Sequence, residues 1–301
     1  MRNQSLTLLA LGAAFGLSSC GEKSSPAADE SAEIKPLVFS AIPDEKVSDQ
    51  DAKFQAMAKY LSATLEVPVE FSISADYNAA VQRFKNGEVH LVWFGGLSGV
   101  QARDAVEGAE AIAQGAEDPK YKSYFIAHSS TGLAKSDEFP AGIKEFSFTF
   151  GSPQSTSGRL MPTWFIKQFT QQTPEEFFTQ PVQFQTSGGH HSTAKAVESG
   201  SVQVGALSYK KYDSMVADGE LDPTKAVIIW ETPFYADYNF TAHPELNEIY
   251  GDGFTNKLQK ALIECTDAEA LNAVNRSQLI EANNEEFEGI RVVAQELEML
   301  R

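Results

Sequence analysis

The stretch Phe146-Ser147-Phe148-Thr149-Phe150 runs directly into Gly151-Ser152-Pro153-Gln154-Ser155-Thr156-Ser157-Gly158. The apolar run predicts a strand, and the glycine-flanked hydroxyl residues predict a turn that leads into a helix near Gly158. The hydroxyls and backbone N–H groups of Ser155, Thr156 and Ser157 would then meet at a helix N-terminus, where the macrodipole favours negative charge. This unit is typical of an oxyanion cradle; the alternative is an ordinary turn with Ser157 as a helix cap.

Short apolar runs alternate with helical patterns on both sides of this unit, which indicates an α/β fold with mainly parallel sheets. After a first strand at residues 37–42, one helical face carries Phe54, Met57, Ala58, Leu61 and Leu65. Residues 121–127 are long enough to enter a second lobe, and residues 227–230 return the chain. We therefore expect one lobe from residues 36–125 plus 232–301 and another from residues 126–231, joined by two crossing strands that act as a hinge.

The N-terminus predicts export. Arg2 precedes the apolar run 6–17 and then Leu17-Ser18-Ser19-Cys20, the layout of a secretory signal that is too short to span a bilayer. The cysteine after Leu-Ser-Ser resembles the bacterial lipobox, so we expect residues 1–19 to be removed and Cys20 to carry lipid; the alternative is a plain signal peptide. Residues 20–35 lack aromatic side chains and read as a flexible tether. The expected location is the periplasm, anchored to a membrane.

Composition excludes several classes of function. The chain has 24 basic and 41 acidic residues, a formal charge of −17, which argues against nucleic acid and against electrostatic attachment to anionic lipid. Any anion must then be held by local, neutral donors. With Cys20 acylated, Cys265 has no disulfide partner and reads as a buried structural thiol. The five histidines form no ligand pair, so we expect no metal and no cofactor.

Four segments resemble the phosphonate, phosphite and phosphate-binding proteins of bacterial ABC importers, and among these most closely members described as selenate-binding. The segments are Ser40-Ala41-Ile42-Pro43-Asp44-Glu45, Trp93-Phe94-Gly95-Gly96-Leu97-Ser98, residues 151–162 and Ser187-Gly188-Gly189-His190. The resemblance covers residues 36–243. It implies a two-lobed periplasmic-binding-protein type II fold, each lobe a mainly parallel sheet flanked by helices. It also implies an ABC permease and its ATPase as partners.

The resemblance also implies site residues. The family's oxyanion cradle falls on Ser155, Thr156 and Ser157, and its ligand-binding histidine falls on His190. Asp237 matches an acidic ligand residue, and Phe94 stands where the family commonly has tyrosine. By their position at strand ends, Phe94, Tyr235 and Tyr238 could close an aromatic wall that excludes water; the alternative, more usual for such residues, is that they pack in the core.

Two of these positions bear on selectivity. A carboxylate at Asp237 would repel an oxyanion unless a proton lies between them, which favours hydrogen phosphite or hydrogen phosphate over selenate. Residues 207–210 lack the acidic residue that recognises the amino group in aminophosphonate binders. Arg159, in the first turn after the cradle, is expected to face solvent or an acidic neighbour.

The sequence therefore predicts a monomeric solute-binding lipoprotein that captures a small oxyanion (phosphonate, phosphite, phosphate or selenate-like) between two lobes and delivers it to a permease. One alternative is a sensor domain that signals to a membrane receptor. Another is an exported phosphatase-like enzyme that uses His190 with a serine. The chain has no Gly-x-Ser-x-Gly elbow, which argues against that enzyme.

Overall fold

The computed structural model describes residues 34–45 and 47–300. The predicted signal peptide, the lipidation site Cys20 and most of the tether lie outside the described residues. Within the described part of the chain, no helix has both the length and the apolar character needed to cross a bilayer.

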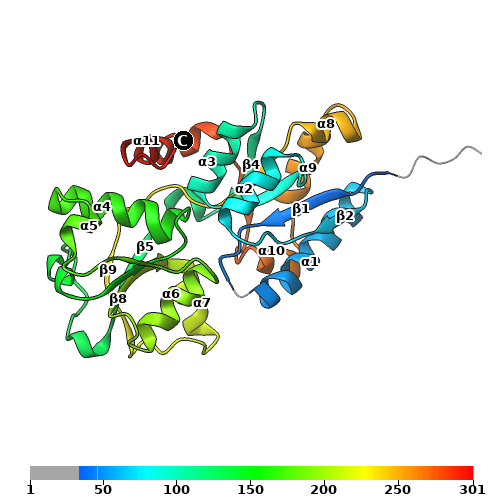
Figure 1. Ribbon diagram of the computed structural model, residues 1–301. Coiled ribbons are helices and arrows are strands. Elements are labelled where there is room, and N and C mark those ends of the chain that lie inside the picture. The colour runs from blue at the N-terminus through cyan, green and yellow to red at the C-terminus, as the bar shows by residue number, and fades with distance from the viewer. Residues whose placement is uncertain (1–33, 46, 301) are drawn as a thin grey trace, which may run out of the picture. The chain divides into compact units, whose positions relative to one another are not determined.

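The first sheet has six strands in the order β11-β4-β10-β3-β1-β2. Helices α1, α9 and α10 pack together on one side of it, and α2 and α3 on the other, with α11 against α3 (Figure 1). The strands are β1 Leu37–Ala41, β2 Val69–Phe71, β3 Leu91–Phe94, β4 Glu110–Gly115, β10 Asn239–Ala242 and β11 Leu279–Glu281. The helices are α1 Val47–Leu65, α2 Tyr77–Lys85, α3 Gly96–Ala105, α8 Glu245–Tyr250, α9 Phe254–Ile263, α10 Ala268–Ala273 and α11 Glu288–Glu296.

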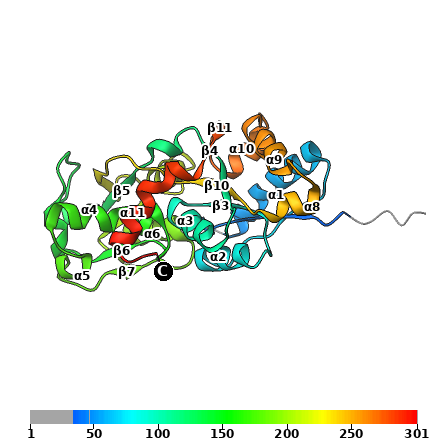
Figure 2. The ribbon, with the colours of Figure 1, turned by 90° about the horizontal axis from the view of Figure 1, so that it is seen from above.

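The second sheet has five strands in the order β7-β6-β8-β5-β9. Figure 2 shows α4 and α5 together at one end of this sheet. Its strands are β5 Ser123–His128, β6 Phe148–Phe150, β7 Gln183–Phe184, β8 Val204–Ser208 and β9 Ala226–Glu231. Its helices are α4 Met161–Thr170, α5 Pro174–Phe177, α6 Gly189–Glu198 and α7 Tyr209–Ala217. Short helical turns complete the chain: η1 Asp118–Lys120, η2 Ser129–Thr131, η3 Ala141–Glu145, η4 Thr156–Leu160 and η5 Asn284–Phe287.

Both sheets are mixed, where the sequence predicted mainly parallel ones. In the first sheet β1 pairs in parallel with β2 and β3, but β10 runs antiparallel between β3 and β4. In the second, β6 is parallel to β7 and β8, but β5 is antiparallel to β8 and β9. The reason is the crossing connections: β5 and β10 enter their sheets directly from the other sheet, without a crossover helix that would make them parallel.

The chain passes between the sheets twice, and the two passages pair with each other. Residues 116–122 lead from β4 to β5, and residues 232–238 lead from β9 to β10. Tyr121 and Tyr235 form an antiparallel bridge, and the Thr232 N–H donates to the Ser123 carbonyl at 3.0 Å. Two adjacent, hydrogen-bonded crossings are the arrangement of a two-stranded hinge.

The predicted apolar face of α1 is confirmed, whereas one residue predicted for the inner face of α4 is exposed. The five residues predicted for the inner face of α1 are all buried: Phe54, Met57, Ala58, Leu61 and Leu65. In the helix after the cradle, the sequence predicts an inner face made of Leu160, Trp164, Phe165 and Phe169, but Phe169 is 54% exposed. It lies in the last turn of α4, where its ring stacks on Phe139 at 5.2 Å over the sheet edge.

A buried ion pair fixes the passage from β4 to β5. The Arg276 Nε and Nη2 groups donate to the two carboxylate oxygens of Asp118 at 2.9 and 2.5 Å, and the Gly115 N–H donates to the same carboxylate at 2.7 Å. Burial lowers the pKa of Arg276, but the charge of Asp118 outweighs burial and leaves that pKa raised. The guanidinium also lies over the ring of Tyr238 at 5.2 Å. This bidentate pair therefore orients the first crossing segment.

We expect Arg276→Met to destabilise the protein by about 3 to 5 kcal/mol, because it leaves the Asp118 carboxylate buried and unpaired. Urea denaturation measures the loss. Arg291→Met is the matched control, since Arg291 pairs with Asp104 at the surface and its loss should cost about 1 kcal/mol or less. Equal losses in the two variants would contradict the role given to Arg276.

Candidate anion-binding site

The turn between β6 and α4 has the predicted strand, turn and helix order. Its first helical turn, η4, is π-helical: the Leu160 N–H donates to the Ser155 carbonyl at 2.9 Å. The Ser155 hydroxyl caps it by accepting the Gly158 N–H at 3.0 Å. The cap is thus Ser155 and not Ser157. A π turn is wider than an α turn, and such turns are frequent at functional sites.

Two glycines leave room for this turn. A Cβ on Gly158 would lie 2.9 Å from the Ser155 Oγ and 3.2 Å from the His190 Cε1. A Cβ on Gly95 would lie 3.2 Å from the Thr156 Oγ1 and 3.3 Å from the Asp237 Oδ1. Any larger residue at either position would therefore displace the polar groups that gather here.

The three hydroxyl residues are buried and contact both sheets' helices. The Thr156 Oγ1 accepts the Leu97 N–H, in the first turn of α3, at 2.9 Å. The Ser157 Oγ lies 3.4 Å from the His190 Nε2, in the first turn of α6. Ser155, Thr156 and Ser157 are each 2% exposed or less. The structure thus brings the predicted cradle together with the predicted histidine.

His190 is a neutral donor. Its Nδ1 accepts the Ser208 N–H at 3.3 Å, so the ring proton is on Nε2, the atom that faces Ser157. Burial, followed by the nearby charge of Lys211, lowers the pKa of His190 to about 3. The imidazole therefore offers one N–H and no positive charge at neutral pH.

Asp237 is the fifth predicted residue in this cluster, and one of its two carboxyl oxygens has no hydrogen-bond partner within the described chain. The Oδ1 accepts the Gly96 N–H of α3 at 2.9 Å, whereas the Oδ2 is buried without a hydrogen-bond partner among the described residues. Burial raises the pKa of Asp237 to about 7, although the Gly96 N–H lowers it in part. The Oδ2 atom is therefore ready to share a proton with a further group.

Tyr77, which the sequence reasoning did not place in the site, belongs to the same cluster. It is the first residue of α2, and its buried hydroxyl has no hydrogen-bond partner within the described chain. Burial, and then the charges of Asp44 and Asp237, raise its pKa well above the ordinary value, so it remains a donor. The signal in the sequence was Asp76, whose side chain caps α2 and so places Tyr77 at a helix start.

Two of the three predicted aromatic residues, Tyr235 and Phe94, lie in different surroundings. Tyr235 is linked to the cradle through one residue, Ser123. The Tyr235 hydroxyl lies 2.5 Å from the Ser123 Oγ, which donates to the Ser157 carbonyl at 2.7 Å. Phe94 packs against Phe84 at 5.8 Å in the core of the first sheet. A direct role for either ring in ligand contact stays a prediction.

Arg159 lies beside the cradle without joining it. Its guanidinium stacks over the rings of Phe150 and Phe184 at 4.3 and 4.8 Å, and it lies 3.6 Å from Glu175. This is the acidic neighbour that the sequence predicted.

The site is therefore built on helix starts. The first turns of α2, α3, η4 and α6 bring Tyr77, Gly96, Thr156 and His190 to one buried cluster. Each helix start adds partial positive charge and N–H donors, so together they favour an anion without a cationic side chain. Residues 34–45 and 47–300 contain no group of three or more His, Cys, Asp or Glu that could hold a metal ion.

Comparison with known proteins identifies the family. Residues 39–287 match the family model described as the ABC transporter, phosphonate, periplasmic substrate-binding protein. The chain belongs to this family. The chain is 32% identical to the probable ABC transporter phosphite binding protein PhnD1 of Prochlorococcus marinus, over 89% of this chain and 91% of the relative. It is 30% identical to the phosphate-import protein PhnD of Mycolicibacterium smegmatis, over 70% and 67% respectively.

Solved structures agree with this assignment. PhnD1 of Prochlorococcus marinus in complex with methylphosphonate has a TM-score of 0.82 at 32% identity, covering 88% of this chain and 98% of that one. A binding protein of an ABC phosphonate transporter from Pseudomonas aeruginosa shares the fold, with a TM-score of 0.74 at 21% identity and 86% and 85% coverage.

Membership of the phosphonate-binding family confirms three predictions. The fold is the two-lobed type II periplasmic-binding fold, and the chain is the substrate-binding component of an ABC importer. It is therefore an exported, periplasmic protein that binds its ligand, as opposed to the phosphatase-like enzyme considered as an alternative. The family's place in transport also favours a permease over a sensory receptor as partner.

The raised pKa of Asp237 predicts a pH-dependent stability. The folded protein holds this proton up to about pH 7 but the unfolded chain only to about 3.8, so the proton's stabilising effect is present below pH 4 and is lost as the pH rises through 7. Asp237→Asn has no such proton to lose, so its stability should not fall in this way. Between pH 4 and pH 7, we expect the free energy of unfolding of the variant to rise relative to the parent by roughly 1.4 kcal/mol per pH unit.

Urea denaturation of the ligand-free protein at pH 4, 6 and 8 measures this gain. Asp252→Asn, at an exposed carboxyl, is the control and should change stability little at any pH. A difference between Asp237→Asn and the parent that stays constant from pH 4 to 8 would show that this proton is not held as described.

Proposed function

We propose that this binding protein captures a small phosphorus oxyanion, namely phosphite, methylphosphonate or phosphate, and delivers it to an ABC permease driven by its ATPase. The observation that carries the proposal is the buried cluster of neutral donors at four helix starts, together with the Asp237 Oδ2, which has no hydrogen-bond partner among the described residues. A tetrahedral anion presents several acceptor oxygens, and this cluster offers donors from four different helix starts.

The proposed contacts divide among the ligand's oxygens. The hydroxyls and first-turn N–H groups of Ser155, Thr156 and Ser157 hold one side of the anion. His190, through its Nε2–H, and Tyr77, through its hydroxyl, donate from the other elements. In a buried site each such bond to a charged group contributes about 1.5 to 3 kcal/mol, so a few of them suffice for micromolar binding or better.

Asp237 supports a ligand with one proton to share. Its Oδ2 and a ligand oxygen can approach each other only with a proton between them, carried by either partner. Hydrogen phosphite, hydrogen phosphate and methylphosphonate titrate near neutral pH and can supply that proton. Selenate and sulfate cannot, so their binding should weaken above about pH 7, where Asp237 loses its own proton. A selenate-binding role stays a prediction.

The relatives support the same ligand class. PhnD1 of Prochlorococcus marinus is described as phosphite binding and was solved with methylphosphonate, and the relative from Mycolicibacterium smegmatis is described as importing phosphate. All three anions have a phosphorus centre with several oxygens and at most one small substituent. This chain's own donors fit that shared chemistry.

We expect the triple variant Ser155→Ala, Thr156→Ala, Ser157→Ala to lose its measurable affinity for phosphite and methylphosphonate, because it removes the donors of the cradle. In calorimetry this is a loss of at least about a hundredfold in affinity. Loss of the Ser155 cap should lower stability by about 1 kcal/mol, and loss of the Thr156 acceptor leaves the buried Leu97 N–H unpaired at a cost of about 1 to 3 kcal/mol. Circular dichroism therefore checks that the variant is folded before its affinity is measured.

Thr163→Ala is the matched control for this variant. Thr163 lies on the same helix, but its hydroxyl bonds the Arg159 carbonyl within the helix, so affinity should stay at the parental value. A thermal-shift panel of phosphite, methylphosphonate, phosphate, selenate and sulfate identifies the preferred anion. Retained affinity in the triple variant would refute the cradle.

We also propose that Cys20 carries the lipid that anchors the protein, and that the protein acts as a monomer. Cys20→Ser should move the protein from the membrane fraction to the soluble periplasmic fraction, since no acyl chain can be attached. Immunoblots of the two fractions measure this, with Cys265→Ser as the control because Cys265 lies buried in the folded body. An unchanged distribution would exclude lipid attachment at Cys20.

A further inference from the structure

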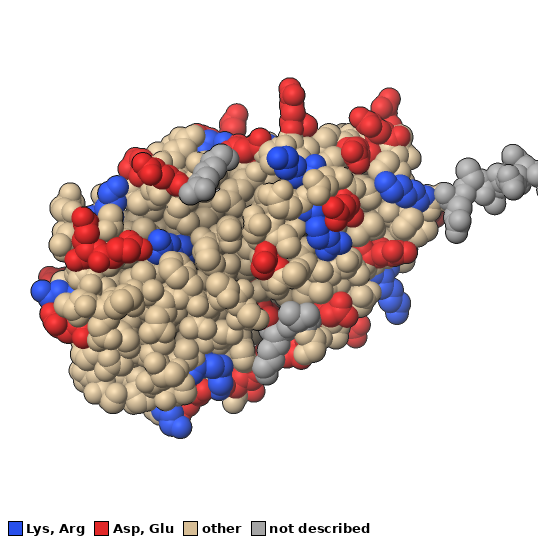
Figure 3. Space-filling view, viewed as in Figure 1, with Lys and Arg blue, Asp and Glu red and all other residues tan. Residues whose placement is uncertain are grey.

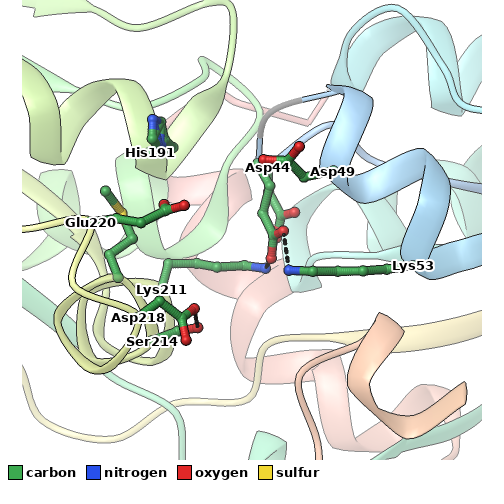
Figure 4. A pocket seen from close by; sticks show the side chains of 10 residues that line it. Asp44, Asp49, Lys53, His191, Lys211, Ser214, Asp218 and Glu220 are labelled. Carbon is green, nitrogen blue, oxygen red and sulfur yellow. Dashed lines mark hydrogen bonds and ion pairs between the residues drawn. The ribbon is translucent and has the colours of Figure 1, made fainter. Parts of the chain in front are cut away.

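A second charged cluster lies next to the anion site and joins elements of both sheets. Lys211, in the first turn of α7, makes an ion pair with Glu45 and lies 3.6 Å from the Asp44 Oδ2. Asp44 and Glu45 follow β1, in the first sheet. Figure 4 shows Lys211 and Lys53 reaching toward Asp44 from opposite sides. Burial alone would raise the pKa of Glu45, but Lys211 and Lys53 lower it to about 2, so this pair is ionised.

The position of Lys211 in its helix is unfavourable without these partners. The start of α7 carries Lys210 and Lys211, where the helix dipole disfavours positive charge. Each lysine is instead held by an acid from outside the second sheet: Lys210 bonds Glu117 at 2.6 Å, and Lys211 bonds Glu45. The lysines are thus stabilised by contacts that exist only when the two sheets' elements lie together.

The Lys211 cluster forms one boundary of the anion site. The Tyr238 hydroxyl donates to the Asp44 Oδ2 at 2.9 Å, and a Cβ on Gly189, the neighbour of His190, would lie 3.2 Å from the Asp44 Cα. The backbone N–H of Lys211 donates to the Ser208 hydroxyl at 3.3 Å, and the Ser208 N–H holds the His190 ring. Lys211 is therefore separated from the ligand-facing histidine by one residue.

A pocket opens beyond this boundary, and the described residues that line it carry more acid than base. Outside Asp44, Glu45 and the two lysines, its lining includes the carboxylates of Asp49, Asp218 and Glu220 (Figure 4). The side chain of Lys211 is only 10% exposed and lines this pocket, while its backbone N–H contacts Ser208, the residue that holds His190. Lys211 therefore belongs both to the acidic pocket and to the border of the anion site.

We propose that Lys211 is a specificity-determining residue. Its ammonium occupies the place beside Asp44 and Glu45 that a ligand's own ammonium group would need. The protein therefore closes on anions with a small, uncharged substituent and rejects a phosphonate whose organic arm ends in an amine. This inference rests on the proposed function, and it assigns the discrimination to one side chain.

Calorimetry with methylphosphonate and 2-aminoethylphosphonate tests the proposal in Lys211→Ala. Removing the lysine leaves Asp44 and Glu45 without their shared partner, so methylphosphonate should bind about tenfold more weakly. The ammonium of 2-aminoethylphosphonate can replace the lost charge, so its affinity relative to methylphosphonate should rise at least about tenfold over the parental ratio.

Lys53→Ala is the matched control. Lys53 also pairs with the Glu45 carboxylate, at 2.9 Å. It lies on α1, which packs on the first sheet, and Glu45 follows β1 of that same sheet. Its loss should leave the ratio of the two affinities unchanged, and Lys211→Arg should also keep the parental ratio. If Lys211→Ala does not fold by circular dichroism, Lys211→Met keeps the side-chain length and should shift the ratio in the same direction.

The outcomes separate this inference from the proposed function. A variant that binds methylphosphonate with the parental ratio of affinities overturns the role of Lys211 and leaves the proposed function intact. A parent protein that binds neither phosphonate nor phosphite overturns the proposed function itself. A parent that already prefers 2-aminoethylphosphonate overturns the inference alone.

Discussion

The first-turn N–H groups of α3 impose the constraint on which the site depends. Buried amide N–H groups must find acceptors, and at a helix start the helix itself provides none. Gly96 donates to Asp237 and Leu97 donates to Thr156, acceptors that lie 141 and 59 residues away in the chain. The same two bonds therefore satisfy α3, draw the cradle against the first sheet, and bury Asp237. Gly95 is small because both acceptors must come this close.

The net charge of this protein has the same sign as the charge of its proposed ligand, and the two act over different distances. Figure 3 shows acidic side chains both along the rim and in the middle of this face, with lysines and arginines between them. Water and salt screen such exposed charges over about 10 Å, whereas buried dipoles act at full strength over short distances. The formal charge of −17 thus sets the electrostatic potential at the surface. The helix starts set the potential within the buried cluster around Ser157 and His190.

How much of this the sequence could predict depends on how local each feature is. Ser155 to Ser157 could be found because three adjacent donors between two glycines act within one turn. His190 could be found because Gly188 and Gly189 mark a helix start. Tyr77 was missed, because Asp76 marks only its place at a helix start, whereas the charges of Asp44 and Asp237 that act on its hydroxyl come from distant parts of the sequence. The pairing of Lys211 with Glu45 spans 166 residues and leaves no trace in a local pattern.

The mixed sheets and Phe169 were missed for a related reason. Strand direction follows from where the chain returns, and β10 lies between β3 and β4 only because the second crossing delivers it there. Phe169 continues the apolar period of α4, but it lies in the last turn of that helix, beside Phe139 and beside Trp230 of the edge strand β9, and stays 54% exposed. The apolar period of a helix shows which residues share a face, but it does not show how far the sheet that packs against that face extends.

Two carboxyls border the site, and they are neutralised in different ways. Asp237 depends on a proton, because burial raises its pKa to about 7. Asp44 depends on Lys211, a cation that the other sheet provides. A buried ion pair of this kind adds little net stability, since desolvation offsets the attraction, but a wrong partner beside it costs several kcal/mol. In the proposed site, the Asp237 side would respond to the ligand's protonation state, and the Lys211 side would respond to the charge of its substituent. Together they would let one small pocket select on both properties with no cation of its own in contact with the anion.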